Sequence, residues 1–318
     1  MKKELTALAG LTADTMPPEL RPSTYFDFSA HPFAHSELLE SSASVVAAIL
    51  RIRAYAEVWL RENLARARTE RVVEFFADAM PSRAPCVGRF HVILEEGAVF
   101  YPSIVMGVCG ASEPHTIFVE RGARLIQAEV YLTEGSVWIG AGTTVEPHAA
   151  IKGPTIIGRN CEIRAGAYLR GCILGDRGVF RGEIKNAVVM DDGSFPHPSY
   201  LGDSICGYRT HFGNQVTAAN FGLFEGLHDP AYLENIVLCV GGRSYDSGTP
   251  KLGIVLGDFC QVGCNSVSDP GTFLEPYTVV YPLSRIPRGF YGPRQILKNK
   301  PLEKGIIEVV PFDPGRSS

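Results

Sequence analysis

Aliphatic residues recur at every sixth position through the middle of the chain. The run IGAGTTVEPHAAIKGPTIIGRNCEIRAGAYLRGCIL starts at residue 139 and places them at Ile139, Val145, Ile151, Ile157, Ile163 and Leu169. Four positions after each stands a mostly small residue: Thr143, Ala149, Thr155, Cys161, Ala167 and, as the larger exception, Ile173. On an α-helix a step of six would spread the aliphatics over three faces, whereas on strands an even step points them all to one side.

Glycine and proline interrupt this run, and they exclude one long strand. The pattern therefore predicts short strands joined by corners, with three faces closing a coil of about 18 residues and successive coils stacked about 4.8 Å apart. Similar hexads begin at positions 119, 174, 201, 212, 256 and 262. We expect a mainly β protein, a parallel β-helix of hexapeptide repeats running from about 92 to about 284, with a slip of phase over 185–200.

Other patterns flank and interrupt the hexads. Apolar residues spaced three and four apart predict amphipathic helix over 37–79, and helices there would cap the open end of the coil. Within 221–253, NIVLCV and RSY flank a Gly-Gly pair, which indicates a hairpin. The expected organisation is an α-helical region over 1–88, the β-helix over 89–284 with its insertion at 221–253, and a C-terminal extension over 285–318.

Composition narrows the class of partner and compartment. The chain of 318 residues has a net charge of −4, which argues against nucleic acid as the main partner. Eight cysteines lie scattered without a CxxC pair, as expected of reduced thiols in a cytoplasmic protein. No apolar run reaches the length of about 18 residues that a membrane span needs, and the N-terminal run does not read as a signal peptide. Pro32 disfavours a helical metal pair at His31 and His35, so no metal requirement is expected.

The stretch SFPHPSYLGDS holds His197 between Pro196 and Pro198. Each proline fixes φ and removes a backbone donor, so this stretch forms a stiff turn. The turn could be a corner with a surface histidine, or it could aim the imidazole at a substrate. The local residues leave both interpretations open.

A wider set of motifs resembles a known family. IKGPTIIGRNCEIRAGAYLRGCILGD, GEIKNAVV, PHPSYLGDSICG and FGNQVTAANF are similar to the left-handed β-helix attached to sugar-1-phosphate nucleotidylyltransferases. The nearest motifs are those of the acetyltransferase domain of bifunctional N-acetylglucosamine-1-phosphate uridylyltransferase/glucosamine-1-phosphate acetyltransferase. The resemblance implies a left-handed coil and a homotrimer. It also implies acetyl-CoA, or another acyl-CoA, as co-substrate and an amino-sugar phosphate or nucleotide sugar as acceptor.

The resemblance also implies roles for individual residues. His197 corresponds to the general base, and imidazole, with a pKa near 6.5, suits proton removal from an amine at neutral pH. Arg164 and Lys185 correspond to the residues that hold the substrate phosphate. Arginine offers a bidentate fork and lysine a point charge for such a group.

The sugar contacts depart further from the family pattern. Tyr200 and Asn220 correspond to residues that contact the sugar. Phe221 stands where the family has a tyrosine, and Gly253 stands where it has a lysine, with Lys251 two residues earlier as the substitute. These departures bear on which sugar binds more than on the class of reaction.

Two classes of function remain open. One is a CoA-dependent N-acyltransferase with Asn214 and Cys264 lining the CoA groove. The other is a non-catalytic β-helix that binds a sugar nucleotide or serves as a trimer scaffold for a separate nucleotidylyltransferase. An open groove at Asn214 and Cys264 would favour the enzyme, and a groove filled by 221–253 would favour the scaffold.

Overall fold

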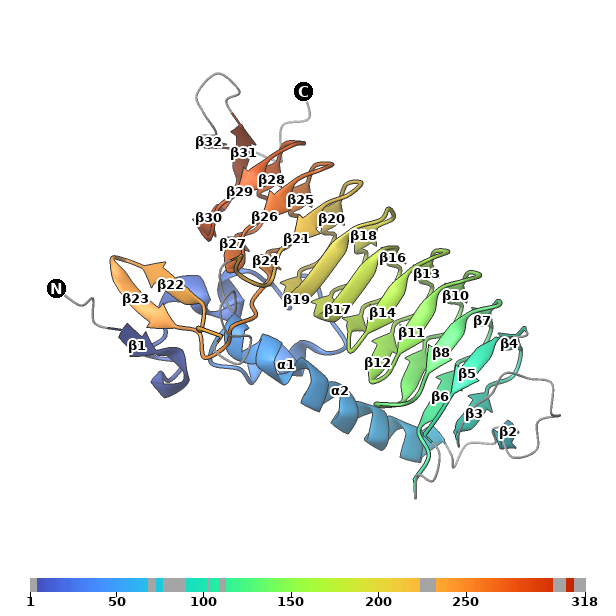
Figure 1. The fold of residues 1–318 in the computed structure, drawn as a ribbon. Coiled ribbons are helices and arrows are strands. Elements are labelled where there is room, and N and C mark those ends of the chain that lie inside the picture. The colour runs from blue at the N-terminus through green and yellow to red at the C-terminus, as the bar shows by residue number, and fades with distance from the viewer. Residues whose placement is uncertain are drawn as a thin grey trace. The chain divides into compact units, whose positions relative to one another are not determined.

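Short strands joined by corners recur through most of the described residues (Figure 1). The computed structural model describes residues 5–67, 73–76, 90–101, 103–108, 113–223, 233–299 and 307–311. The chain divides into two units: Ile52–Pro198, here called the central unit, and Met1–Arg51 with Ser199–Ser318, here called the terminal unit.

Three ladders of parallel strands form the central unit. The first ladder contains β4 (Val99–Phe100), β7 (Arg124–Leu125), β10 (Thr144–Val145), β13 (Glu162–Ile163), β16 (Val179–Phe180) and β18 (Ser194–Phe195). The second contains β5 (Ile104–Met106), β8 (Glu129–Tyr131), β11 (Ala150–Lys152), β14 (Tyr168–Arg170) and the start of β17 (Glu183–Val189). The third contains β3 (His91–Leu94), β6 (Thr116–Val119), β9 (Val137–Ile139), β12 (Thr155–Ile157), β15 (Ile173–Leu174) and the end of β17.

The hexad residues fill the inside of this coil, which confirms the predicted parallel β-helix, the left-handed hexapeptide-repeat fold class. All six aliphatics from Ile139 to Leu169 have 0% exposure. Burial of each such side chain stabilises the fold by about 1.5–3 kcal/mol. Val145 pairs with Ile163, three hexads further along the chain as predicted, whereas Phe180 pairs with Phe195, which falls short of three hexads. The shorter coil accounts for the expected slip of phase.

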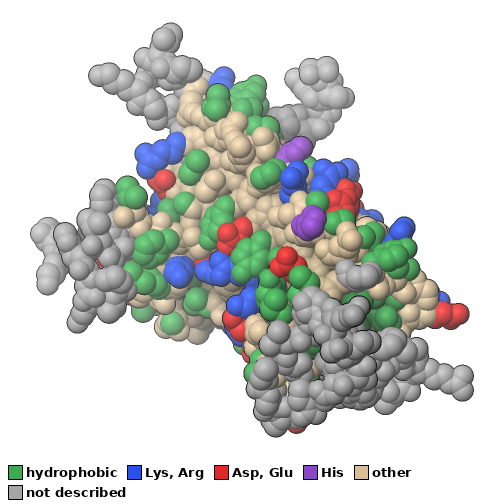
Figure 2. Space-filling model, turned by 45° about the vertical axis from the view of Figure 1, so that its right-hand side comes forward, with side chains coloured by type: hydrophobic (Ala, Val, Ile, Leu, Met, Phe, Trp, Pro, Cys, Tyr) green, Lys and Arg blue, Asp and Glu red, His purple; other side chains and the backbone are tan. Residues whose placement is uncertain are grey.

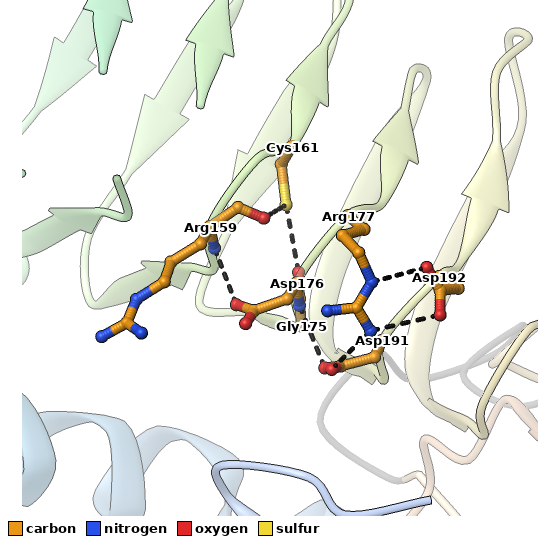
Figure 3. Close-up of polar contacts among 7 residues, drawn as sticks. All are labelled: Arg159, Cys161, Gly175, Asp176, Arg177, Asp191 and Asp192. Atoms are coloured by element: carbon orange, nitrogen blue, oxygen red, sulfur yellow. Dashed lines mark hydrogen bonds and ion pairs between the residues drawn. The ribbon is translucent and has the colours of Figure 1, made fainter. Parts of the chain in front are cut away.

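Carboxylates join the corners of successive coils (Figure 3). Asp176 Oδ1 accepts the backbone N–H of Arg159 at 2.7 Å, and Asp191 Oδ1 accepts that of Asp176 at 3.0 Å. Arg177 donates to Asp191 and Asp192. Burial raises the pKa of the Asp191 carboxyl, so its ionised form costs stability despite these donors. The nearby Cys161 thiol has its pKa raised to about 12 by burial, which makes it a packing residue.

Strands of the terminal unit continue the same pattern. One ladder contains β20 (His211–Phe212), β25 (Gln261–Val262), β28 (Val279–Val280) and β31 (Gln295–Asn299), and β32 (Ile307–Pro311) adds antiparallel to it. The others contain β19 (Tyr200–Cys206), β21 (Thr217–Ala218), β24 (Ile254–Leu256), β26 (Val267–Ser268), β27 (Thr272–Leu274), β29 (Arg285–Ile286) and β30 (Gly289–Tyr291). The coils therefore continue through β31, past residue 284 where the prediction ended them.

The insertion contains the predicted hairpin. β22 (Val237–Val240) pairs antiparallel with β23 (Arg243–Asp246) around Gly241 and Gly242, whose φ values are 55° and 78°. The two glycines meet the positive φ that a tight hairpin turn requires. β1 (Leu5–Ala7) adds in parallel to β23, a pairing with no signal in the sequence. Residues 224–232 of the insertion lie outside the described residues.

The N-terminal helices are shorter than predicted. After three short 3-10 helices, η1 (Leu8–Gly10), η2 (Pro18–Leu20) and η3 (Pro22–Thr24), come α1 (Ser36–Glu40) and α2 (Val45–Ala67). The prediction of helix up to 79 is wrong at β2 (Val73–Phe76), which pairs antiparallel with β3. Its sequence VEFF is rich in strand-forming residues, and the partner strand decides its state. Residues 68–72 and 77–79 lie outside the described residues.

The later part of α2 contacts a side of the central coil. Trp59 packs edge-on against Trp138 of β9 with ring centroids 5.2 Å apart, and Arg53 forms an ion pair with Glu134. The prediction that the helices cap the open end therefore does not hold for this part of α2. None of the helices in the described ranges combines the length and the apolar character needed to cross a membrane.

Candidate active site

A corner of the central unit brings Arg164 to the His197 turn. Arg164 follows β13, and its Nη1 donates to the backbone oxygen of Pro196 at 3.2 Å, while its Nε donates to Glu162 at 2.7 Å. His197 follows directly, exposed on a bend of the chain. Two residues that are far apart in sequence thus lie at the same corner because the coil returns there. The guanidinium holds a fixed position beside the turn that carries the imidazole.

Lys185 belongs to a row of basic residues on an outer face of the same unit. The strand register aligns Lys152 of β11, Arg170 of β14 and Lys185 of β17. Each is adjacent to a buried aliphatic residue, so all three point outward. Arg170 donates to Glu183 at 2.6 Å and lies over the Tyr168 ring, 5.4 Å from its centroid. Neighbouring strands therefore line up three cations about 4.8 Å apart.

Acidic side chains accompany this basic row. Lys152 forms an ion pair with Glu134 and lowers the pKa of that carboxyl. Glu183 forms the corresponding ion pair with Arg170. Figure 2 shows one face of the molecule on which basic and acidic side chains lie interspersed. Local balance of this kind suits recognition of a small charged ligand better than binding of an extended polyanion.

In the terminal unit, Tyr200 and Asn220 converge on the backbone of Gly202. A Cβ built on Gly202 would lie 2.5 Å from Tyr200 Oη and 2.8 Å from Asn220 Nδ2. Glycine is therefore required here for close approach. Asn220 Nδ2 also donates to Asp203 Oδ2 at 2.5 Å, and both residues are buried, at 8% and 6% exposure. The structure thus brings together the two residues predicted to contact the sugar.

Lys251 lies next to this pair on the returning chain. It forms an isolated antiparallel bridge with Phe221, and the N–H of Leu252 donates to the backbone oxygen of Asn220 at 2.9 Å. Its own side chain is exposed. Lys251, the predicted substitute for the family's lysine, therefore lies next to the backbone hydrogen bond between Leu252 and Asn220.

Asn214 and Cys264 meet at another corner of the terminal unit. The N–H of Asn214 donates to Cys264 Sγ at 3.3 Å, and the N–H of Asn265 donates to Asn214 O at 2.8 Å. Asn214 follows β20 and Cys264 follows β25, two strands of the same ladder. Asn220 follows β21, which belongs to another ladder. The corner that these two residues form is the predicted CoA-lining position.

Sequence reasoning misses two basic residues and one side-chain partner of an acidic residue. The motifs do not single out Arg170 or Arg181, although Arg181 follows β16 as Arg164 follows β13 in the preceding coil. Arg170 lies about one coil before Lys185 in the sequence, and Arg181 lies about one coil after Arg164. This spacing is the sequence signal that could have pointed to both residues. The recurring Gly-Asp pairs predict that Asp203 bonds a corner of its own coil. Its Oδ2 accepts a hydrogen bond from the amide of Asn220 in the adjacent coil.

Several known proteins are similar to parts of this chain. The family model for bacterial transferase hexapeptide (six repeats) matches residues 136–177. The bifunctional sugar-1-phosphate nucleotidylyltransferase/acetyltransferase of Sulfurisphaera tokodaii is 30% identical over 159 residues, covering 43% of this chain and 38% of that protein. The uncharacterized acetyltransferase YaiX of Escherichia coli (strain K12), named as putative, is 31% identical over 172 residues, covering 52% of this chain and 71% of that protein. The structure of LpxA from Acinetobacter baumannii aligns over 65% of this chain and 71% of that chain, with 16% identity and a TM-score of 0.30.

The repeats and the stacked ladders define a protein of the hexapeptide-repeat β-helix class. The chain belongs to the bacterial hexapeptide-repeat transferase family. The resemblance to the β-helix of sugar-1-phosphate nucleotidylyltransferase/acetyltransferases is confirmed by the Sulfurisphaera relative. The match spans about two fifths of the length of that relative, 38%.

Proposed function

We propose that this protein is a CoA-dependent N-acyltransferase whose acceptor is an amino-sugar phosphate or a nucleotide sugar, with His197 as general base. The observation that carries the proposal is the hydrogen bond from Arg164 to Pro196, which puts a guanidinium group at the turn of the imidazole. Relatives named as acetyltransferases support the class of reaction.

The proposed reaction joins the acceptor nitrogen to the acyl carbon. The neutral amine attacks the thioester carbonyl, His197 takes the proton from nitrogen, and the C–S bond breaks. The proton then passes to the departing CoA thiolate, so that the products are an amide and free CoA. Imidazole has a pKa suited to both transfers near neutral pH. Because Pro196 and Pro198 stiffen the turn, little conformational entropy is lost in aiming the imidazole.

Two basic side chains of the central unit would bind the acceptor phosphate. Arg164 already donates through Nε to Glu162 and through Nη1 to Pro196, which fixes the plane of the guanidinium. Lys185, outward on β17 beside Arg170, adds a point charge on the basic row. A fixed guanidinium fork and a lysine ammonium together suit a phosphate group.

The corner of Asn214 and Cys264 would contact the acyl-CoA. The hairpin of the 221–253 insertion contacts another part of the terminal unit. Arg288 Nη1 donates to Val237 O at 3.3 Å, and a Cβ on Gly271 would lie 3.1 Å from a Leu238 methyl group. These contacts follow β26, whereas Cys264 precedes it. This placement of the hairpin favours an open groove at Asn214 and Cys264 over a groove filled by the hairpin.

We further propose that the protein assembles as a homotrimer with parallel coils.

The test replaces the proposed base. His197→Ala is expected to lower kcat for acyl transfer to an amino-sugar phosphate by about 10²–10⁴-fold, the usual contribution of acid–base catalysis. KM for the acyl-CoA should hold, and the deficit should shrink as pH rises and the amine loses its proton unaided. His148→Asn is the matched control, because His148 is an exposed corner histidine of the same unit whose φ of 64° asparagine tolerates.

Three outcomes separate the hypotheses. Full activity in His197→Ala would show that the turn is only a corner. Equal losses in His197→Ala and His148→Asn would indicate a structural effect. If the parent protein transfers no acyl group to any amino sugar, the binding or scaffold hypothesis replaces the enzyme.

A further inference from the structure

Asp203 is a buried carboxylate with an unusual partner. It has 6% exposure and sits at a φ of 49°, in the left-handed region. Its backbone oxygen accepts the N–H of Gly253 at 2.8 Å, and its Oδ2 accepts from Asn220 Nδ2 at 2.5 Å. The backbone of Asp203 therefore links neighbouring coils, and its carboxylate binds the side chain of Asn220.

The chemistry of this pair fixes the orientation of the amide. An ionised carboxylate can only accept hydrogen bonds, so the NH₂ side of the Asn220 amide must face Asp203. Oδ1 of Asn220 is then left as a hydrogen-bond acceptor in a known direction. The backbone of Asn220 is held as well, because its carbonyl accepts the N–H of Leu252. An amide anchored in this way cannot exchange its donor and acceptor ends.

The anchored amide lies where the acceptor substrate is proposed to bind. Tyr200 Oη and Asn220 Nδ2 both approach the α-carbon of Gly202. We propose that Asp203 is a positioning residue, which holds the Asn220 carboxamide so that Oδ1 accepts a hydrogen bond from an amino or hydroxyl group of the sugar. The inference rests on the proposed function and specifies an acceptor that carries a donor group at this point.

A buried aspartate of the same unit provides the contrast. Asp258 has 4% exposure, and its carboxylate accepts the backbone N–H groups of Tyr208 at 2.8 Å and Asp27 at 2.9 Å. Both aspartates follow a glycine of the hexad pattern. Asp258 joins main-chain segments, whereas Asp203 orients a side chain. Replacing one carboxylate oxygen of Asp258 by an NH₂ group would leave a main-chain N–H without its acceptor, so this change should affect stability alone.

The experiment compares Asp203→Asn with Asp258→Asn. Asparagine tolerates the left-handed backbone at position 203 but can turn either end toward Asn220, so the direction of Oδ1 is no longer fixed. Asp203→Asn should lower kcat/KM for the acceptor by roughly tenfold, a change of about 1.4 kcal/mol, without changing KM for the acyl-CoA. Asp203→Gly, which also suits the backbone, removes the acceptor and should cost more. Asp258→Asn should lower Tm and leave kcat/KM unchanged.

A double-mutant cycle tests whether Asp203 acts through Asn220. In an Asn220→Ala background, Asp203→Asn should change kcat/KM less than twofold, because the side chain that it positions is gone. Additive losses would overturn the inference. So would an Asp203→Asn variant with parental kcat/KM, in which case the acyltransferase function would stand. A parent protein without transfer to any amino sugar would instead reject the function, and the inference with it.

Discussion

Gly202→Ala isolates the geometry of the proposed sugar site from the stability of the coil. The new Cβ would lie 2.5 Å from Tyr200 Oη, 2.8 Å from Asn220 Nδ2 and 3.0 Å from Tyr200 Cζ. These nearest atoms all belong to side chains, and the glycine has no positive φ. The two side chains can therefore move, and the main chain need not.

The size of the movement follows from ordinary contact distances. Tyr200 Oη must shift from 2.5 Å to the 3.4 Å of a normal contact, or about 0.9 Å, and Asn220 Nδ2 from 2.8 Å by about 0.6 Å. A displacement near 1 Å at a site that orients substrate can reduce the rate about 10²-fold. We expect kcat/KM for the acceptor to fall by about that factor. KM for the acyl-CoA should change little.

Steady-state kinetics and thermal unfolding together make the assay. Gly257→Ala is the contrasting variant, because its Cβ would lie 2.6 Å from the backbone nitrogen of Pro276, an atom that cannot move alone. That variant should unfold at a clearly lower temperature, with an overpacking cost of about 1–3 kcal/mol. Gly202→Ala should lose less thermal stability than Gly257→Ala, because the atoms that its Cβ meets belong to side chains. Parental kcat/KM in Gly202→Ala would refute the placement of the acceptor over Gly202.

Further predictions address phosphate, pH and assembly. Lys185→Ala should weaken binding of an amino-sugar phosphate by about 1.5–3 kcal/mol in calorimetry, and equal losses for the unphosphorylated sugar would assign the lysine a structural role. Burial raises the pKa of the Asp191 carboxyl, so the folded state keeps this proton to higher pH than the unfolded state does. The contribution of Asp191 to the free energy of unfolding therefore falls as pH rises from about 3.8 through the pKa of the folded state. Asp191→Asn should remove that part of the decline in urea unfolding measured as a function of pH, and parallel profiles for parent and variant would contradict it. Light scattering should give the mass of a trimer at micromolar concentration, and a monomer would contradict the proposed homotrimer.

Local patterns in the sequence predict much of the fold. The six-residue spacing from Ile139 to Leu169 predicts the coil because only strands with corners put all those side chains inside. The Gly241-Gly242 pair predicts the hairpin because it supplies the two positive φ angles of the turn. Each signal acts between residues a few positions apart, so a single sequence is enough to detect it.

Contacts between residues far apart in the sequence decided the parts of the fold that local patterns did not predict. Val73–Phe76 became a strand because β3 offered it a partner, and β1, near the start of the chain, pairs with β23 in the distant insertion. The pairing of Asp203 with Asn220 likewise depends on how many residues each coil contains, and the coils differ in length, as the pairs Val145–Ile163 and Phe180–Phe195 show. The sequence by itself determined the repeat and the candidate residues. Only the tertiary structure decided which of them meet, because contacts across coils depend on the register of the stacked strands within each unit.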